Sequence, residues 1–202
     1  MTETADTRTS APRLSVSAPS GPTVIQRATA LDAAEIAYVA AITFPLACPP
    51  HSHREDMAAF ITSNLSPAHF GAYLSDPACA VFVARTESEI TGYTLIKTGP
   101  PAADAECELP PGLALELSKI YVLPGHHGTG TSAQLMGAAV QHARNARAST
   151  LWLGVNSLNE RAQRFYRKCG FTYAGTRTFT VGSQTEHDFI FALNLSSAAP
   201  DV

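Results

Sequence analysis

A glycine-rich segment in the second half of the chain has the residue types of an anion-binding loop. Residues 121–132, YVLPGHHGTGTS, join an apolar stretch to an amphipathic one and carry glycines at 125, 128 and 130. Glycine adopts backbone conformations with positive φ and has no β-carbon to keep a ligand from the main chain. The amide N–H groups from about Gly128 to Ser132 would converge at the start of a helix, where unpaired donors favour a negative charge. The loop predicts a pyrophosphate site, although a plain tight turn would look similar.

Two common nucleotide-binding motifs do not fit this loop. It lacks the Gly-Lys-Ser/Thr ending of a P-loop, and its glycines do not follow the spacing G-x-G-x-x-G. A metal site is not expected either, because the side chains of adjacent His126 and His127 diverge and no carboxylate cluster stands at ligand spacing. The prediction is an anion held mainly by backbone amides.

A second segment downstream identifies the class of chemistry. Residues 151–171 read LWLGVNSLNERAQRFYRKCGF. Together with the glycine loop they resemble motifs A and B of the GNAT superfamily of acyl-CoA-dependent N-acetyltransferases. With the phrases LSKIYVLP and GTRTFTVGSQTEHDFIFAL, the chain most resembles the bacterial PaiA-type branch, which includes polyamine acetyltransferases. The resemblance is close over residues 113–195 and extends loosely back to residue 23, with His127 at the position of the family's usual Gln or Arg.

The resemblance implies an enzyme that moves an acetyl group from acetyl-CoA to an amine of a small molecule, for instance a polyamine, in a ternary complex. A homodimer is also implied. A non-catalytic acyl-CoA-binding regulatory module and a protein N-terminal or lysine acetyltransferase are the alternatives. The residues expected to bind the cofactor are Ile120, Val122, His127, Gly128, Thr129, Gly130, Thr131, Ser132, Asn156, Asn159 and Phe165.

The expected cofactor slot is a break between parallel strands that end near Val122 and Val155. The Val122 amide is the natural donor to the thioester carbonyl, and Asn156, at the end of its strand, can hydrogen-bond the pantetheine amides. Asn159 has two interpretations, a helix cap or a cofactor contact. A Ser157–Glu160 capping box is the alternative start of the same helix.

Tyr166 is the predicted general acid. The resemblance places the matching tyrosine beside the coenzyme A sulfur, and a phenol with an ordinary pKa near 10 is protonated at neutral pH. The alternative is structural, because Ala162, Phe165, Tyr166 and Cys169 have the spacing of one buried helix stripe.

Glu116 is the predicted general base, which would deprotonate an ammonium substrate through water. It stands six residues before Val122, so the two side chains share a face of the strand if no bulge intervenes. Ser118 would share that face and Lys119 would not. Glu116 could instead face solvent or pair with an arginine.

The elements that must position these residues follow from hydrophobic periodicity and from turn residues. Asp32 is expected at or near a helix N-cap, and the breaks at Pro45 and at Pro49-Pro50 are expected to end that helix, at about Thr43. The predicted class is α/β (α+β), a mixed and mostly antiparallel sheet of six to seven strands flanked by helices, with a splayed parallel pair. The strands are expected at residues 23–27, 80–85, 90–97, 113–122, 151–155, 171–181 and 187–195, and the helices at 32–43, 54–63, 66–74, 131–146 and 159–169.

Composition limits the remaining possibilities. The chain has 202 residues, a formal net charge of −3 and 15% charged residues, which argues against a disordered chain and against a basic nucleic-acid binder. No apolar run approaches the ~20 residues that span a bilayer, and residues 1–22 lack the apolar stretch of a signal peptide. We therefore expect a cytoplasmic protein without a membrane partner, with a disordered tail at 1–22, an N-acetyltransferase domain at 23–195 and a second tail at 196–202.

Overall fold

A single mixed sheet organises the part of the chain that the computed structural model describes, residues 21–49, 51–103, 105–181 and 184–196. The tails predicted at 1–22 and 196–202 lie almost entirely outside the described residues. The strands are β1 Thr23–Arg27, β2 Cys79–Thr86, β3 Glu89–Thr98, β4 Glu106–Cys107, β5 Ala114–Val122, β6 Thr150–Asn156, β7 Thr172–Val181 and β8 Gln184–Asn194. The helices are α1 Ala33–Ala47, α2 Arg54–Asn64, α3 Pro67–Ser75, α4 Thr131–Asn145 and α5 Glu160–Lys168, with short 3-10 turns at Ala30–Asp32 and Pro124–His126.

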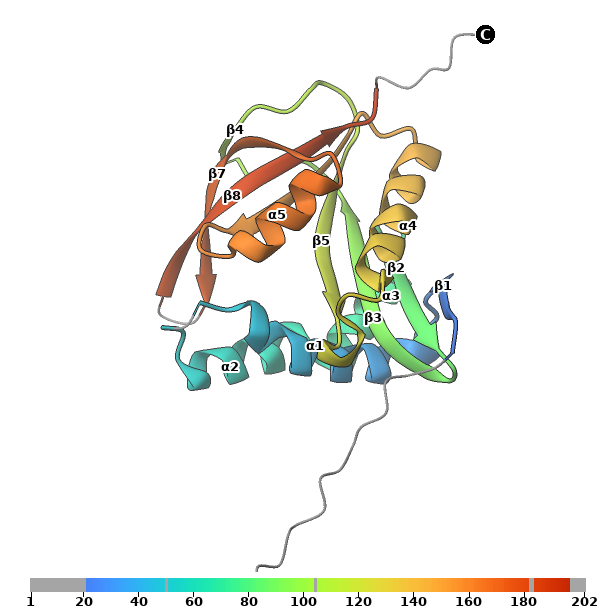
Figure 1. Ribbon diagram of the computed structural model, residues 1–202. Coiled ribbons are helices and arrows are strands. Elements are labelled where there is room, and N and C mark those ends of the chain that lie inside the picture. The colour runs from blue at the N-terminus through green and yellow to red at the C-terminus, as the bar shows by residue number, and fades with distance from the viewer. Residues whose placement is uncertain (1–20, 50, 104, 182–183, 197–202) are drawn as a thin grey trace, which may run out of the picture.

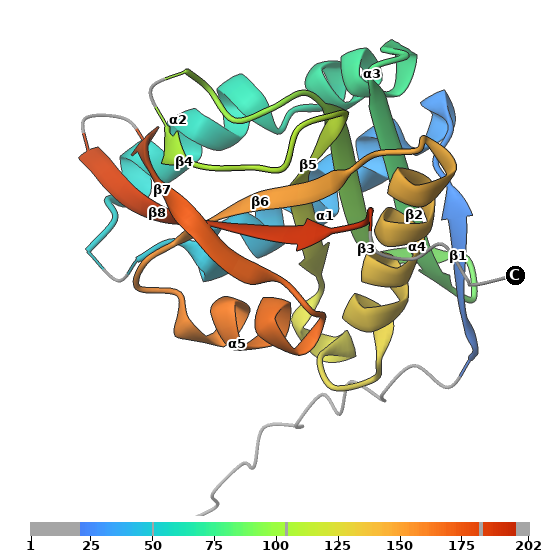
Figure 2. The ribbon, with the colours of Figure 1, turned by 90° about the horizontal axis from the view of Figure 1, so that it is seen from above.

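The predicted fold class is confirmed. The strand order is β1-β2-β3-β5-β6-β8-β7-β4, and β5–β6 is parallel while the other described pairs are antiparallel. Eight strands are present instead of six or seven, because the proline-rich loop before β5 contributes the two-residue strand β4 at the edge of β7. Helices α1, α2 and α3 lie on one side of the sheet and α4 and α5 on the other (Figures 1 and 2).

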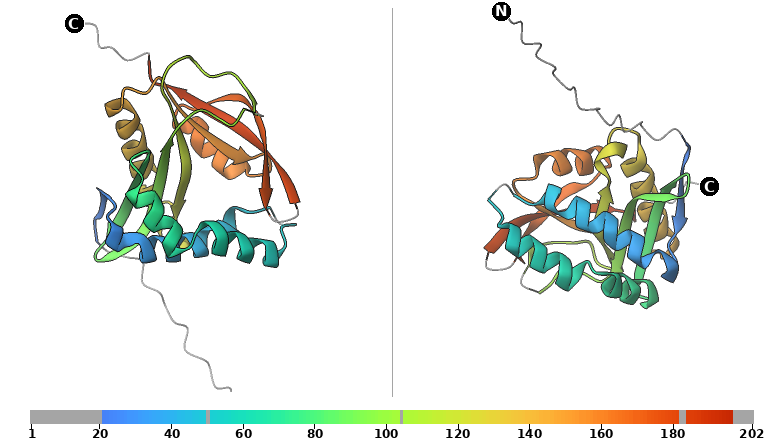
Figure 3. Two further views of the ribbon diagram at one scale, coloured as in Figure 1. Left: turned by 180° about the vertical axis from the view of Figure 1, so that it is seen from behind. Right: turned by 90° about the horizontal axis from the view of Figure 1, so that it is seen from below.

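The parallel pair at the centre of the sheet is splayed. Strands β5 and β6 pair only at Ala114–Thr150, Leu115–Leu151 and Glu116–Trp152, although both strands continue beyond these residues. The two halves of the sheet diverge below this short contact, with α1 and α2 running across the open end (Figure 1 and the left panel of Figure 3). The backbone edges of β5 and β6 are therefore unpaired with each other along the gap.

Two hydrophobic cores hold the halves in place. On one face Ile36, Phe70 and Tyr93 belong to a buried cluster that joins α1 and α3 to β2 and β3. On the other face Met136 and Phe191 belong to a cluster that joins α4 to β5, β6 and β8. The second cluster includes residues of both halves, for instance Ile96 of β3 and Leu151 of β6, so packing on α4 holds the halves together where strand pairing is missing.

The predicted end of the first helix at about Thr43 is wrong, because α1 continues past Pro45 to Ala47 and ends just before the second predicted break at Pro49. Proline removes one backbone donor from a helix, but the buried face of α1 extends through Thr43 and Phe44. Phe44 stacks on Phe60 of α2, with ring centroids 4.6 Å apart, and this packing holds the last turn. Residues 30–47 are long and apolar enough to cross a bilayer by length and composition alone, yet their apolar face packs into the core.

A β-bulge in β5 overturns the predicted parity of this strand. Leu95 of β3 pairs with Lys119 and the next residue, Ile96, pairs with Leu117, so Ser118 is an extra residue. A bulge of this kind reverses the alternation of side chains beyond it. The Glu116 side chain therefore shares a face with Lys119 and not with Val122.

Gly92 of β3 allows a close approach of β5 and α4 just opposite the end of β5. A β-carbon there would lie 2.7 Å from the carbonyl oxygen of Tyr121 and 3.2 Å from Leu135 Cδ1. We expect Gly92→Ala to lower the free energy of unfolding by about 1–3 kcal/mol, because overpacking displaces the backbone. Urea denaturation measures this. Gly71→Ala in α3, where no atom lies within 4 Å of the added carbon, is the control and should raise stability slightly. Equal effects of the two substitutions would contradict the close approach.

Candidate active site

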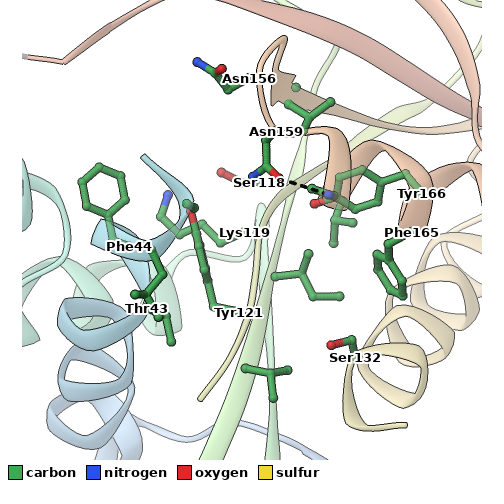
Figure 4. A pocket seen from close by; sticks show the side chains of 18 of the residues that line it. Thr43, Phe44, Ser118, Lys119, Tyr121, Ser132, Asn156, Asn159, Phe165 and Tyr166 are labelled. Carbon is green, nitrogen blue, oxygen red and sulfur yellow. Dashed lines mark hydrogen bonds between the residues drawn. The ribbon is translucent and has the colours of Figure 1, made fainter. Parts of the chain in front are cut away.

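A cavity of about 760 Å³ occupies the gap between β5 and β6. It reaches from the glycine loop and α5 on one side of the sheet to α1, α2 and α3 on the other (Figure 4). The cavity is lined by nine of the eleven predicted cofactor-binding residues, and by both predicted catalytic residues, Tyr166 and Glu116. The nine are Ile120, Val122, His127, Gly128, Gly130, Ser132, Asn156, Asn159 and Phe165.

The strand edges that face the gap offer backbone hydrogen bonds. Leu123 N–H donates to Thr91 O (2.8 Å), so the Gly92–Val122 pair is a non-hydrogen-bonded pair of the antiparallel ladder. The Val122 N–H therefore points away from β3 and toward the gap, and the same alternation applies to Ile120. On β6, the bond from Ser157 N–H to His187 O likewise turns the backbone of Asn156 away from β8. A ligand that carries amides can thus hydrogen-bond both edges of the gap, as a strand inserted between β5 and β6 would.

The glycine corner at the start of α4 is open. Gly128 and Gly130 have φ of +82° and +88°, and no atom lies within 4 Å of the position of a β-carbon at either residue. The first helical bond runs from Gln134 N–H to Gly130 O (3.0 Å), so the amides of residues 131–133 have no acceptor within the helix. The open space beside the two glycines and the free amides at the N-terminus of this fifteen-residue helix together form a site that can bind an anion.

Three side chains of the loop are held by the loop itself. His127 Nε2 lies 2.9 Å from Val122 O, which fixes the ring over the end of β5. The hydroxyls of Thr129 and Thr131 lie 2.9 Å apart, and neither residue is among those that line the cavity. These two threonines can offer only their backbone amides to a ligand in this geometry.

The turn between β6 and α5 is shaped by two asparagines that also line the cavity. Asn159 is the N-cap of α5 and its side chain accepts the Ala162 N–H at 3.1 Å, so the capping interpretation is confirmed. Asn156 Oδ1 accepts the Leu158 N–H at 2.9 Å. The alternative Ser157–Glu160 capping box is wrong, because Asn159 is the N-cap and Glu160 is therefore the first residue of α5 instead of the third.

Tyr166 extends from α5 into the cavity, on the opposite side from Tyr121 of β5 (Figure 4). Burial, together with the nearby Tyr121 and Cys169, raises the pKa of the Tyr166 hydroxyl well above its usual value. The stripe interpretation also holds in part, since Ala162, Phe165 and Tyr166 pack against the core. The same three residues line the cavity, so packing fixes the orientation of the phenol.

Glu116 lies in a charged cluster at the other end of the cavity. Arg177 of β7 donates to Glu116 at 3.5 Å and to Asp188 of β8 at 3.3 Å. The guanidinium lies 5.5 Å from the Trp152 ring centroid and occupies the space that a side chain at Gly154 would take. The expected alternative, pairing with an arginine, is what the structure shows for Glu116. Its role as a base stays a prediction.

Lys119 is a cavity residue that sequence reasoning missed. Burial, and then the like charge of Lys97 on β3, lowers the pKa of Lys119 to about 8. Both ammonium groups lie near the ring of Tyr73 in α3, at 4.8 Å for Lys97 and 5.7 Å for Lys119. The sequence analysis placed Lys119 on the other face because the bulge at Ser118 cannot be recognised from the alternation of residue types. Arg177 and Asp188 stood in the recognised C-terminal phrase, but nothing in their spacing pointed to the cavity.

The fold, the splayed strands and the open glycine corner define an acyl-coenzyme A-dependent transferase of the class expected from the sequence. The model of the acetyltransferase (GNAT) family matches residues 43–171. The chain belongs to this family and is an acyltransferase.

Particular relatives agree with this assignment. An uncharacterized N-acetyltransferase of Mycobacterium tuberculosis is 46% identical over 164 residues, which is 81% of this chain and 98% of the relative. Streptothricin acetyltransferase of Streptomyces lavendulae is 41% identical over 89 residues, 43% of this chain and 45% of that protein. Among solved structures, the PaiA N-acetyltransferase of Thermoplasma acidophilum in complex with coenzyme A has a TM-score of 0.68 at 18% identity, covering 86% of this chain and 99% of that one.

The lowered pKa of Lys119 can be measured directly. We expect Lys119 to titrate near pH 8, so that it is charged below this pH and neutral above it. Lys97→Met should raise this pKa because it removes the nearby like charge. NMR titration of isotope-labelled lysine side chains measures the Lys119 pKa in the wild type and in the variant. Lys168→Met, in the exposed part of α5, is the control and should leave the Lys119 pKa unchanged. A Lys119 pKa at the ordinary ~10.4 would contradict the burial seen here.

Proposed function

We propose that the protein transfers an acetyl group from acetyl-CoA to the amine of a small molecule by direct attack in a ternary complex. The observation that carries the proposal is one continuous cavity lined by the glycine corner, by two unpaired strand edges and by the phenol of Tyr166. The Thermoplasma protein of the same fold binds coenzyme A, which supports the choice of cofactor.

The cofactor would lie along the gap with its diphosphate at the corner of α4. The amides of residues 128–132 supply donors to the phosphate oxygens, where the helix dipole adds to the attraction. The pantetheine arm has two amides and would hydrogen-bond the backbone of Ile120 and the Asn156 N–H, since the Asn156 carbonyl already accepts from Asn159 N–H. The Val122 N–H would then polarise the thioester carbonyl, as backbone donors do in an oxyanion hole.

The reaction needs two proton movements. The acceptor ammonium loses a proton, and Glu116, which lines the acceptor end, is the proposed base acting through water. The neutral amine attacks the thioester carbon, the C–N bond forms and the C–S bond breaks. Tyr166 would give its proton to the departing thiolate, which its raised pKa permits because the phenol is protonated at every physiological pH.

Replacing the proposed acid tests its role. Tyr166→Phe keeps the packed ring and removes only the hydroxyl, so we expect kcat to fall by about 10²–10⁴-fold with little change in acetyl-CoA affinity. Thiol-release kinetics and isothermal titration measure the two quantities. Tyr173→Phe, at an exposed ring on β7 away from the cavity, is the matched control and should leave both unchanged. Lost affinity with unchanged turnover of the bound enzyme would refute the acid role.

Filling the glycine corner tests the phosphate site. Gly130→Val places a branched side chain in the open space and strains a backbone with φ of +88°. We expect coenzyme A affinity to fall at least about tenfold, since hydrogen bonds to a charged group are lost. Gly137→Ala, in the exposed part of the same helix, should bind coenzyme A normally. Normal binding by a folded Gly130→Val protein would show that the diphosphate lies elsewhere.

A further inference from the structure

Two lysines on adjacent strands form a positively charged wall at the acceptor end of the cavity. Lys97 comes from β3 and Lys119 from β5, and both line the cavity. Their ammonium groups share the ring of Tyr73 as a neighbour, at 4.8 Å and 5.7 Å from its centroid. Like charges brought together in a partly buried wall repel each other. An anion between them would relieve this repulsion.

Among the described residues the charge of Glu116 favours the charged form of Lys119, but this carboxylate is shared with Arg177. The two carboxylates that line this end, Glu116 and Asp188, both pair with Arg177. Two carboxylates among three cations leave an excess of one positive charge when both lysines are protonated. A ligand that carries a negative charge would therefore balance the charges at this end of the cavity.

A polyamine is a poor match for this wall. After its reacting amine loses a proton, a polyamine still carries at least one ammonium group that would need a carboxylate. The carboxylates that line this end are already held by Arg177, and Lys97 and Lys119 would repel the extra cation.

We propose that the acceptor is an amine that also carries a carboxylate, which binds between Lys97 and Lys119. The inference rests on the proposed acetyl transfer and names the class of its acceptor. Each lysine can donate a charge-assisted hydrogen bond to the carboxylate. The rest of the acceptor would lie against the stacked rings of Phe44 and Phe60, which line the same end. The carboxylate is not consumed: the product is the N-acetylated acid, and coenzyme A leaves as the thiol.

Matched acceptors test the proposal in the full chain. L-Phenylalanine and phenethylamine differ only by a carboxylate, as do L-lysine and cadaverine, and phenylalaninamide keeps the frame of phenylalanine without the negative charge. We expect kcat/KM for the acid of each pair to exceed that for its decarboxylated partner and for the amide. Higher kcat/KM for the decarboxylated amines would overturn the proposal.

Substitution of the lysines links this preference to the wall. Lys97→Met and Lys119→Met should each lower the ratio of kcat/KM for the acid to that for the decarboxylated amine by about 10–100-fold, mainly through KM for the acid. The dissociation constant of coenzyme A serves as the check that the variants fold. Lys168→Met, in the exposed part of α5, removes an equal charge far from the wall and should keep the wild-type ratio. An unchanged ratio in both wall variants would also overturn the proposal.

Product binding separates this inference from the proposed function. If coenzyme A binds but no amine is acetylated, the proposed function is wrong. The carboxylate site between the lysines is then tested by calorimetric measurement of ligand binding. N-acetylphenylalanine should bind the coenzyme A complex more tightly than N-acetylphenethylamine, and Lys97→Met should remove the difference. Equal binding of the two compounds would refute the carboxylate subsite by itself.

Discussion

The absence of strand pairing between β5 and β6 beyond their first three residue pairs is the constraint on which the site depends. A buried backbone N–H or C=O without a partner costs free energy, so an unpaired pair of edges at the centre of a sheet needs a substitute partner. The fold tolerates the gap because each face of the sheet has its own hydrophobic core, and the core beneath α4 includes residues of both halves. The cofactor would complete the sheet at its centre, and its amides would take the place of a missing strand.

Much of this arrangement could be predicted from the sequence, because it depends on local patterns. The alternation in β2 and β3, the apolar stripe of α4 and the glycines before it indicated the elements within a few residues. The two candidate interpretations of Asn159 also had a local basis, and its side chain satisfies the capping one. Pro45 shows where a local rule fails, since the packing of Phe44 outweighs the lost backbone donor.

The acceptor end could not be predicted in the same way, because it depends on one extra residue and on contacts across the sequence. The bulge at Ser118 turns Lys119 toward the face of Glu116, and sequence alternation alone placed it on the other face. Arg177 comes 61 residues after Glu116 and reaches it only because Gly154 has no side chain. Bulges beside active sites redirect side chains in this manner.

The charges of the site match the course of the proposed reaction along the cavity. The start of α4 offers the positive end of a helix dipole at one end, and the lysine wall offers positive charge at the other. Between them lie Tyr121 and Tyr166, whose hydroxyls burial keeps protonated. Attack on a thioester develops negative charge on the carbonyl oxygen and then on sulfur. A cavity with amide donors at one end, cations at the other and protonated phenols at its centre would stabilise that charge more than the neutral thioester, which is the requirement for catalysis.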